Sequence, residues 1–247
     1  MPLPNESVQK RKVYLRGGLS AMHASIRVGF ESIKMNAVPM LTLWLLSVIT
    51  VSAYYCVPKV ALALEPIAHF QTACGGGAAF LNRVVFCGIL PGLFLLMPRL
   101  RPRFLLATVA LQALWCGLWG VACDWLYTMQ CHWFGEGRDW AVLLKKTIVD
   151  QFAWTPFFLA PLNALFFFWV GADFSVQRMR SEWPNSFLCN ILLPNLVANW
   201  IVWIPVLCVV YAFPLPLQVQ LSGFAGSFWM LVSLQVGRNS ASHGEPT

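Results

Sequence analysis

Hydrophobic residues follow one another along this chain in long runs, and short segments between the runs carry nearly all of the charge. A run of about 20 apolar residues is long enough to cross a bilayer as a helix. The pattern therefore predicts an all-α, polytopic transmembrane helical bundle of about six spans. The six predicted spans are 35–58, 78–96, 104–127, 152–172, 186–212 and 217–236.

The first 34 residues have a different pattern. After a basic polar tail, apolar residues recur from Leu15 at every third or fourth position, and charged residues fall between them. This spacing predicts an amphipathic interfacial helix whose arginines face anionic lipid headgroups. An organellar transit helix is the alternative, which Glu31 and the lack of an evident cleavage site disfavour.

The chain accordingly divides into three parts. They are a basic tail with the amphipathic helix over 1–34, the transmembrane bundle over 35–237, and a polar tail over 238–247 that we expect to be disordered. Within the bundle, residues 59–77 are predicted to connect the first two spans, and 128–137 form the longest polar break in the middle of the chain.

Composition supports a membrane protein. Hydrophobic residues make up 58% of the chain and charged residues 11%, against about 25% charged in an ordinary soluble domain. The net charge is +7, and the basic residues that produce it flank the apolar runs. They do not gather on a soluble face with stacking aromatic residues, so we expect these residues to contact lipid headgroups and not nucleic acid.

The basic residues also predict a topology. If the N-terminus lies on the cytoplasmic-type side, twelve of the 17 Lys and Arg residues fall on that side and four on the other, with Arg83 inside the second run. This asymmetry satisfies the positive-inside rule and places both termini on the cytoplasmic-type side. We expect the side chain of Arg83 to extend to the membrane interface.

Catalytic and metal chemistry have little support. The eight cysteines lie mostly within apolar runs and show no Cys-x-x-Cys spacing, and the four histidines lie outside the clear spans. No nucleophile stands beside a base, and no paired carboxylates are evident. We expect no enzyme activity, no metal site and no cofactor.

The fourth predicted span, 152–172, has an irregular beginning. Asp150 and Gln151 precede it, and Pro156 and Pro161 lie inside it. Each proline lacks an N–H and clashes with the carbonyl four residues back, which predicts a kinked or broken entry half. Asp150 and Gln151 would then form a polar mouth on the outer side. In the second span, Gly88-x-x-x-Gly92 predicts the close approach of another helix.

The fifth span carries several amides. Asn195 and Asn199 are one helical turn apart and share a face. Pro194 and Pro205 free the carbonyls of Asn190 and Ile201, and these groups need partners or water. Asn163 of the fourth span adds a further amide. Two interpretations stay open: the amides hold helices together, or they line a polar path through the bundle.

The second half of the chain contains a characteristic series of polar, proline and aromatic residues. The series consists of Lys145-Lys146, Asp150-Gln151, Pro156, Trp183-Pro184, Asn190, Pro194, Asn199-Trp200, Pro205 and Ser233. In this order the residues of about 103–238 resemble the family of the Mpv-seventeen and peroxisomal 22-kDa membrane proteins. Leu193, Trp200 and Phe228 depart from the family's pattern, and no arginine follows Pro205, which puts a charge-selective gate in doubt.

The resemblance implies a small, multi-pass integral membrane protein that acts as a small-solute channel or permeability-modulating pore. It implies a bacterial inner (plasma) membrane, with an organellar inner membrane as the alternative. Small solutes or ions are the expected ligands, and a homo-oligomer stays open. The alternative function is a non-transporting scaffold or stress and homeostasis accessory protein. A secondary transporter is disfavoured because no internal repeat is evident.

Overall fold

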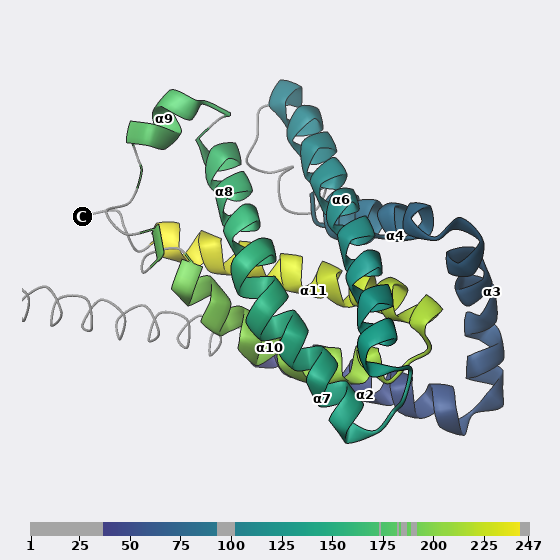
Figure 1. Cartoon of the computed structure of the whole chain (residues 1–247). Coiled ribbons are helices and arrows are strands. Elements are labelled where there is room, and N and C mark those ends of the chain that lie inside the picture. The colour runs from purple at the N-terminus through teal and green to yellow at the C-terminus, as the bar shows by residue number, and fades with distance from the viewer. Residues whose placement is uncertain are drawn as a thin grey trace, which may run out of the picture. The chain divides into compact units, whose positions relative to one another are not determined.

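The computed structural model describes residues 37–92, 102–172, 174–181, 183, 187–188 and 192–242. Every regular element over these residues is a helix (Figure 1), which confirms the predicted all-α class. The helices are α2 (Ala37–Cys56), α3 (Pro58–Cys74), α4 (Gly76–Arg83), η1 (Val84–Ile89), α6 (Pro102–Phe134), α7 (Trp140–Ile148), η2 (Val149–Leu159), α8 (Ala160–Gly171), α9 (Val176–Ser181), α10 (Leu193–Tyr211) and α11 (Leu215–Ser242). Of these, η1 and η2 are π-helical.

Two helices among the described residues are long and apolar enough to cross a membrane, Leu106–Phe134 and Trp140–Gly171. A third span results if Met40–Cys56 and Pro58–Cys74, which meet at an angle of 103°, are taken together. The apolar helices Gly76–Gly92 and Asn195–Tyr211 are shorter. Helices suited to a membrane are therefore present, and six spans stay a prediction. The predicted amphipathic helix in 1–34 lies outside the described residues.

The bend after α2 has a local cause. Val57 is extended, with φ −121° and ψ 101°, and Pro58 begins the next helix. The residue before a proline is biased away from the helical region, and proline suits a first helical turn. Residues 59–74 then continue as α3, so most of the predicted connection over 59–77 is helical instead.

Helix α6 is longer than its apolar run. It continues to Phe134, well into the predicted polar break at 128–137. Residues 128–134 contain neither glycine nor proline, so nothing local ends the helix before Gly135. Gly135 has φ 82° and its N–H donates to the carbonyl of Cys131 at 2.8 Å, which ends the helix in a left-handed residue.

The prolines of the fourth predicted span do not break it. Pro156 lies within η2, and Pro161 stands in the first turn of α8, yet Trp140–Gly171 is one continuous helix. The expected break is therefore absent, and the entry half is π-helical over Val149–Leu159; a kink there stays a prediction. A π-helix bonds each N–H to the carbonyl five residues back and is wider than an α-helix, so the missing N–H of Pro156 is absorbed without a sharp bend.

The chain forms two compact units. The larger unit consists of Asn36–Asp150 and Val202–Thr247, and the described part of the smaller unit lies within Gln151–Ile201. In the larger unit, α11 contacts α2, α3, α4, η1 and α6, which makes it the central helix of that unit. Helix α11 continues to Ser242, so the first residues of the predicted disordered tail over 238–247 are helical.

Glycines allow η1 to pack closely against α6. A Cβ on Gly88 would overlap the Cα of Ala113, and a Cβ on Gly92 would lie 3.2 Å from the nearest atoms of Val109. Both residues of the Gly88-x-x-x-Gly92 motif therefore face the same helix at successive turns. The predicted close approach of another helix is confirmed.

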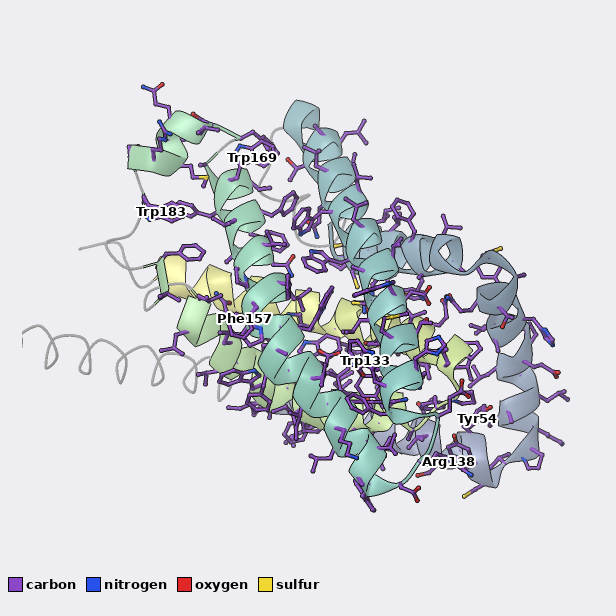
Figure 2. The ribbon with its side chains drawn as sticks, in the orientation of Figure 1. Tyr54, Trp133, Arg138, Phe157, Trp169 and Trp183 are labelled. Carbon is purple, nitrogen blue, oxygen red and sulfur yellow. The ribbon has the colours of Figure 1, made fainter. Side chains whose placement is uncertain are left out.

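Large apolar side chains cover the outside of each unit. Leu106 on α6 is 77% exposed and Phe157 on η2 is 73% exposed. Trp133, also on α6, is 57% exposed, and Figure 2 labels it together with Phe157. Exposed apolar surface on this scale is unusual for a soluble monomer and marks an interaction surface, here one suited to lipid.

Candidate functional site

The central helix α11 carries polar residues on buried positions. Other helices of the larger unit surround α11. Four of its polar residues are buried as a result: Gln218, Gln220, Ser222 and Ser227. Burying an amide or hydroxyl is unfavourable unless it is hydrogen-bonded. The partners of these groups therefore define the polar interior of the larger unit.

A chain of side-chain hydrogen bonds joins three helices in this interior. Gln220 of α11 donates from Nε2 to Oε1 of Gln71 on α3 at 2.6 Å. Gln71 in turn donates from Nε2 to Oδ1 of Asp124 on α6 at 2.8 Å. The three residues lie far apart in sequence, and we call them the Gln71 chain. Each link fixes one helix against the next, because the amide geometry admits few alternatives.

Asn82 and Arg83, at the end of α4, also contact α11. Asn82 donates from Nδ2 to the carbonyl of Gln220 at 3.3 Å, and Arg83 donates from Nη2 to Oγ of Ser222 at 2.9 Å. Ser222 is fully buried. The guanidinium of Arg83 therefore lies against a buried residue of the central helix, and its extension to the membrane interface stays a prediction.

Asp150 belongs to a second polar cluster of the larger unit. It is 6% exposed, and its Oδ2 accepts a 2.6 Å hydrogen bond from the hydroxyl of Tyr211. Lys146, one helical turn before Asp150, is 1% exposed. Its Nζ donates to Sγ of Cys131 at 3.2 Å and lies 5.9 Å from the centre of the Tyr211 ring. We call these four residues the Asp150 cluster.

An aromatic contact supports the Asp150 cluster from α6. The rings of Tyr127 and Tyr211 meet edge to face with centroids 5.1 Å apart, and both residues are buried. Such a pair favours a fixed ring orientation, which keeps the hydroxyl of Tyr211 directed at Asp150. A buried lysine and a buried aspartate on successive turns place a basic and an acidic side chain inside a helical unit with an apolar exterior.

The smaller unit has its own polar contact at Gln151. Asn199 of α10 donates from Nδ2 to Oε1 of Gln151 at 2.9 Å, and Trp200 donates from Nε1 to the backbone carbonyl of Gln151 at 2.8 Å. Gln151 donates from Nε2 to Oγ1 of Thr155 at 3.3 Å. Two consecutive residues of α10 thus hold one residue of the π-helical stretch η2.

The residues that the sequence suggested for a polar path do not all lie together in the structure. Gln151 and Asn199 are brought together, whereas Asn195 lies on the exposed surface of α10 and Asn163 is half-buried on α8. Asp150 is buried and accepts a hydrogen bond from Tyr211, and its place at a polar mouth stays a prediction. Asn190 lies outside the described residues.

The prolines proposed as helix breakers fall within continuous helices. Pro194 is in the first turn of α10 and Pro205 in its interior, and α10 continues past both to Tyr211. A proline inside a helix removes one hydrogen bond without ending the helix when the surroundings support it.

The sequence reasoning missed the glutamines and Tyr211. Gln71, Gln130, Gln218 and Gln220 are all buried in the larger unit. Gln218 and Gln220 stand in an otherwise apolar run, which is the signal that could have found them, since a polar residue in such a run needs a partner. Tyr211 carries no such signal, because tyrosine is ordinary at the end of a membrane helix.

Gln130 is the most unusual of these glutamines. It is fully buried on α6, and neither Oε1 nor Nε2 has a hydrogen-bond partner in the protein. Buried side-chain amides are nearly always satisfied by protein or by ordered water. The amide of Gln130 therefore offers one donor group and one acceptor to a water or a small polar solute inside the larger unit.

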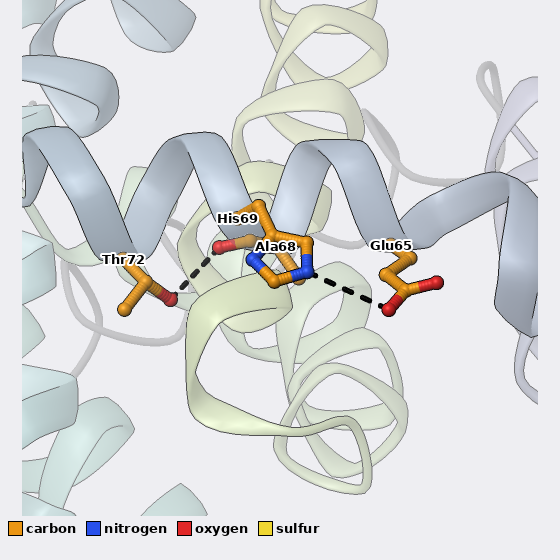
Figure 3. A network of polar contacts seen from close by, with 4 residues as sticks. All are labelled: Glu65, Ala68, His69 and Thr72. Carbon is orange, nitrogen blue, oxygen red and sulfur yellow. Dashed lines mark hydrogen bonds and ion pairs between the residues drawn. The ribbon is translucent and has the colours of Figure 1, made fainter.

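The polar pair on α3 is a surface feature. His69 Nε2 and Glu65 Oε1 are 3.5 Å apart at i, i+4 (Figure 3), with side chains 77% and 55% exposed. Exposed ion pairs contribute little to stability. Among the described residues, no group of three or more His, Cys, Asp or Glu side chains could hold a metal ion.

These features define an all-helical protein with helices long and apolar enough for a membrane and with polar clusters in its interior. Comparisons of the chain with protein-family models, with curated proteins and with solved structures found no match. The resemblance of the second half to the Mpv-seventeen and peroxisomal 22-kDa family stays a prediction.

Proposed function

We propose that this chain is a multi-pass integral membrane protein that forms, or regulates, a pore for small solutes. The observation that carries the proposal is the Asp150 cluster, in which Lys146 and Asp150 are almost fully buried inside a helical unit whose exterior is apolar. Ionisable residues within a membrane bundle are costly, and they mark solute and ion pathways.

Gln130 adds to this support. In a closely packed scaffold without water, a buried amide that has no partner would destabilise the fold by about 1–3 kcal/mol. A polar path that admits water gives the amide its hydrogen bonds. The unpartnered atoms of Gln130 therefore favour a hydrated interior in the larger unit over a dry one.

The proposed topology has six spans, with both termini on the cytoplasmic-type side, as the distribution of Lys and Arg indicates. The proposed membrane is a bacterial inner membrane or an organellar inner membrane, as in the family that the second half resembles. In this topology the carboxylate of Asp150 stands near the outer side, where it favours cations over anions.

Release of small solutes from liposomes tests the proposal. Purified protein is reconstituted into vesicles loaded with a neutral sugar or with a labelled monovalent cation, and efflux is followed beside empty vesicles. The proposal predicts efflux that rises with the amount of folded protein inserted. Efflux no faster than from empty vesicles, at confirmed insertion, would contradict it.

A non-transporting scaffold is the second candidate function. It is favoured by the Gln71 chain and by the Gln151–Asn199 pair, in which amides bond to one another across helices. In a scaffold these bonds serve only to hold helices together, each contributing about 0.6–2 kcal/mol. The scaffold predicts that breaking them lowers stability while vesicle permeability stays at background.

A further inference from the structure

Arg83 carries a positive charge in the interior of the larger unit, where α4 ends and η1 begins. Its Nη2 donates to Oγ of Ser222 at 2.9 Å, and its Nη1 donates to Sγ of Cys87 at 3.7 Å. Its Nε is buried and has no hydrogen-bond partner. A guanidinium has five N–H donors, so the group is only partly satisfied.

Both acceptors of Arg83 also donate to backbone carbonyls of α11. Ser222 donates its own hydroxyl proton to the carbonyl of Val219 at 2.9 Å. Cys87 directs its thiol proton to the carbonyl of Gly223 at 3.4 Å. Neither group is a carboxylate, the side chain that ordinarily supplies the negative charge a buried guanidinium requires.

No described carboxylate neutralises Arg83 either. The carboxylates that the structure describes are Glu65, Asp124, Glu136, Asp139 and Asp150, and none of them forms an ion pair with Arg83. Asp124 accepts from Gln71 and Asp150 accepts from Tyr211.

Two glycines bring the neighbouring helices against the Arg83 side chain. A Cβ on Gly120 of α6 would lie 2.7 Å from Cγ of Arg83, and a Cβ on Gly226 of α11 would lie 3.1 Å from Nη1. The half-buried Arg83 side chain therefore lies between α6 and α11. A monoatomic ion suits such a position better than a phosphate or a lipid headgroup.

We propose that Arg83 binds a small halide-type anion, such as chloride, in the interior of the larger unit, with Nε–H as the donor that the protein leaves unpaired. The anion supplies the counter-charge that no described side chain provides. A counter-ion at Arg83 is needed equally in a pore and in a scaffold, so its presence does not depend on solute transport.

Chloride binding to the purified protein in detergent tests this site directly. Equilibrium binding of radioactive chloride is measured, and the thermal midpoint is followed as sodium gluconate is replaced by sodium chloride at constant ionic strength. We expect saturable binding of about one chloride per chain and a midpoint that rises with chloride, because a ligand that binds only the folded state stabilises it.

Two matched variants locate the anion. Arg83→Met removes the guanidinium and retains an unbranched apolar chain, whereas Lys59→Met removes the charge of an exposed lysine on α3. We expect the chloride dependence to disappear in Arg83→Met and to remain in Lys59→Met. If Arg83→Met does not fold, Arg83→Lys retains the charge without the planar fork, and about tenfold more chloride is expected for the same stabilisation.

Several results would overturn the site. One is wild-type protein that binds no chloride saturably and has the same thermal midpoint in both salts. Another is chloride binding that is unchanged in Arg83→Met, or unchanged in Arg83→Lys where the Met variant fails to fold, which would place the ion elsewhere. Silent vesicles in a transport assay would leave a chloride site at Arg83 intact, so the two proposals fail separately.

Discussion

Asn199 donates a 2.9 Å hydrogen bond from Nδ2 to Oε1 of Gln151, which lies 48 residues earlier in the chain. Its neighbour Trp200 donates to the backbone carbonyl of the same glutamine at 2.8 Å. In a π-helix the carbonyls are offset from their usual partners, so a side-chain donor from another helix helps to satisfy them. The smaller unit thus uses α10 to stabilise the unusual backbone of η2.

Asn199→Leu should lower the stability of the folded protein in detergent. The leucine has a similar volume but no donor for Gln151, so the loss is expected to be about 0.6–2 kcal/mol. Thermal unfolding followed by tryptophan fluorescence measures it. His132→Leu is the control, because it places a leucine at an exposed position near the end of α6. Equal losses in the two variants would contradict the importance of the Gln151–Asn199 bond.

Tyr211→Phe should destabilise the larger unit by removing the 2.6 Å bond to Asp150. A hydrogen bond to a charged group contributes about 1.5–3 kcal/mol, and the buried carboxylate loses one partner. Tyr54→Phe serves as the control, since Tyr54 is only half-buried and packs by ring contacts with Tyr55 and Phe213. Chemical denaturation of both variants decides the matter, and a Tyr211→Phe protein as stable as Tyr54→Phe would refute the role given to the hydroxyl.

Gly88→Ala should be unfavourable although alanine is the better helix former. The added Cβ would overlap the backbone of Ala113 on α6, and overpacking of this kind costs about 1–3 kcal/mol. A Cβ on Gly77 of α4 would meet nothing within 4 Å, so Gly77→Ala is expected to be neutral or to stabilise by up to about 1 kcal/mol. Comparing the two thermal midpoints tests the η1–α6 contact, which a tolerated Gly88→Ala would rule out.

The proposed topology can be tested with single cysteines. Cys74 ends α3 and is exposed, and in the six-span arrangement it lies on the outer side. In a variant that retains only Cys74, a membrane-impermeant maleimide added outside intact cells or vesicles should label it. Ser175→Cys in a cysteine-free background should be labelled only after permeabilisation. The opposite pattern, or labelling of both positions from one side, would exclude this topology.

The sequence predicted the helical class and the close approach at Gly88 because both follow from local patterns. Runs of apolar residues leave little choice but helices when the chain enters a membrane, and small residues one turn apart create a groove on one helix face. These properties require no knowledge of which helix is the partner. The structure supplies that partner, Ala113 and Val109 of α6.

The course of the backbone at breaks was harder to predict. Residues 59–74 carry Lys59, Glu65 and His69 and were expected to form a connection, yet they form α3. Charge marks exposure and not the end of a helix, and only Pro58 and Gly75 stand where the backbone turns. Likewise, Pro156 suggested a broken helix because the sequence does not reveal a π-helical stretch that absorbs it.

The candidate site was predicted in part. Gln151 and Asn199 were both selected as buried polar residues, and the structure joins them. The link between Asp150 and Tyr211 spans 61 residues, and no spacing rule connects residues so far apart. Gln71, Gln220 and Asp124 meet only because α3, α6 and α11 come together in the larger unit, which is tertiary information.

Planar-bilayer recording tests the proposed pore most directly. Purified protein is reconstituted, and currents are recorded in asymmetric salt from the wild type, from Asp150→Asn and from the control Asp139→Asn, which neutralises an exposed carboxylate. We predict discrete conductances with a cation preference that weakens in Asp150→Asn and persists in Asp139→Asn. Silent bilayers from well-folded, inserted protein would contradict the pore, and an unchanged reversal potential in Asp150→Asn would remove Asp150 from its lining.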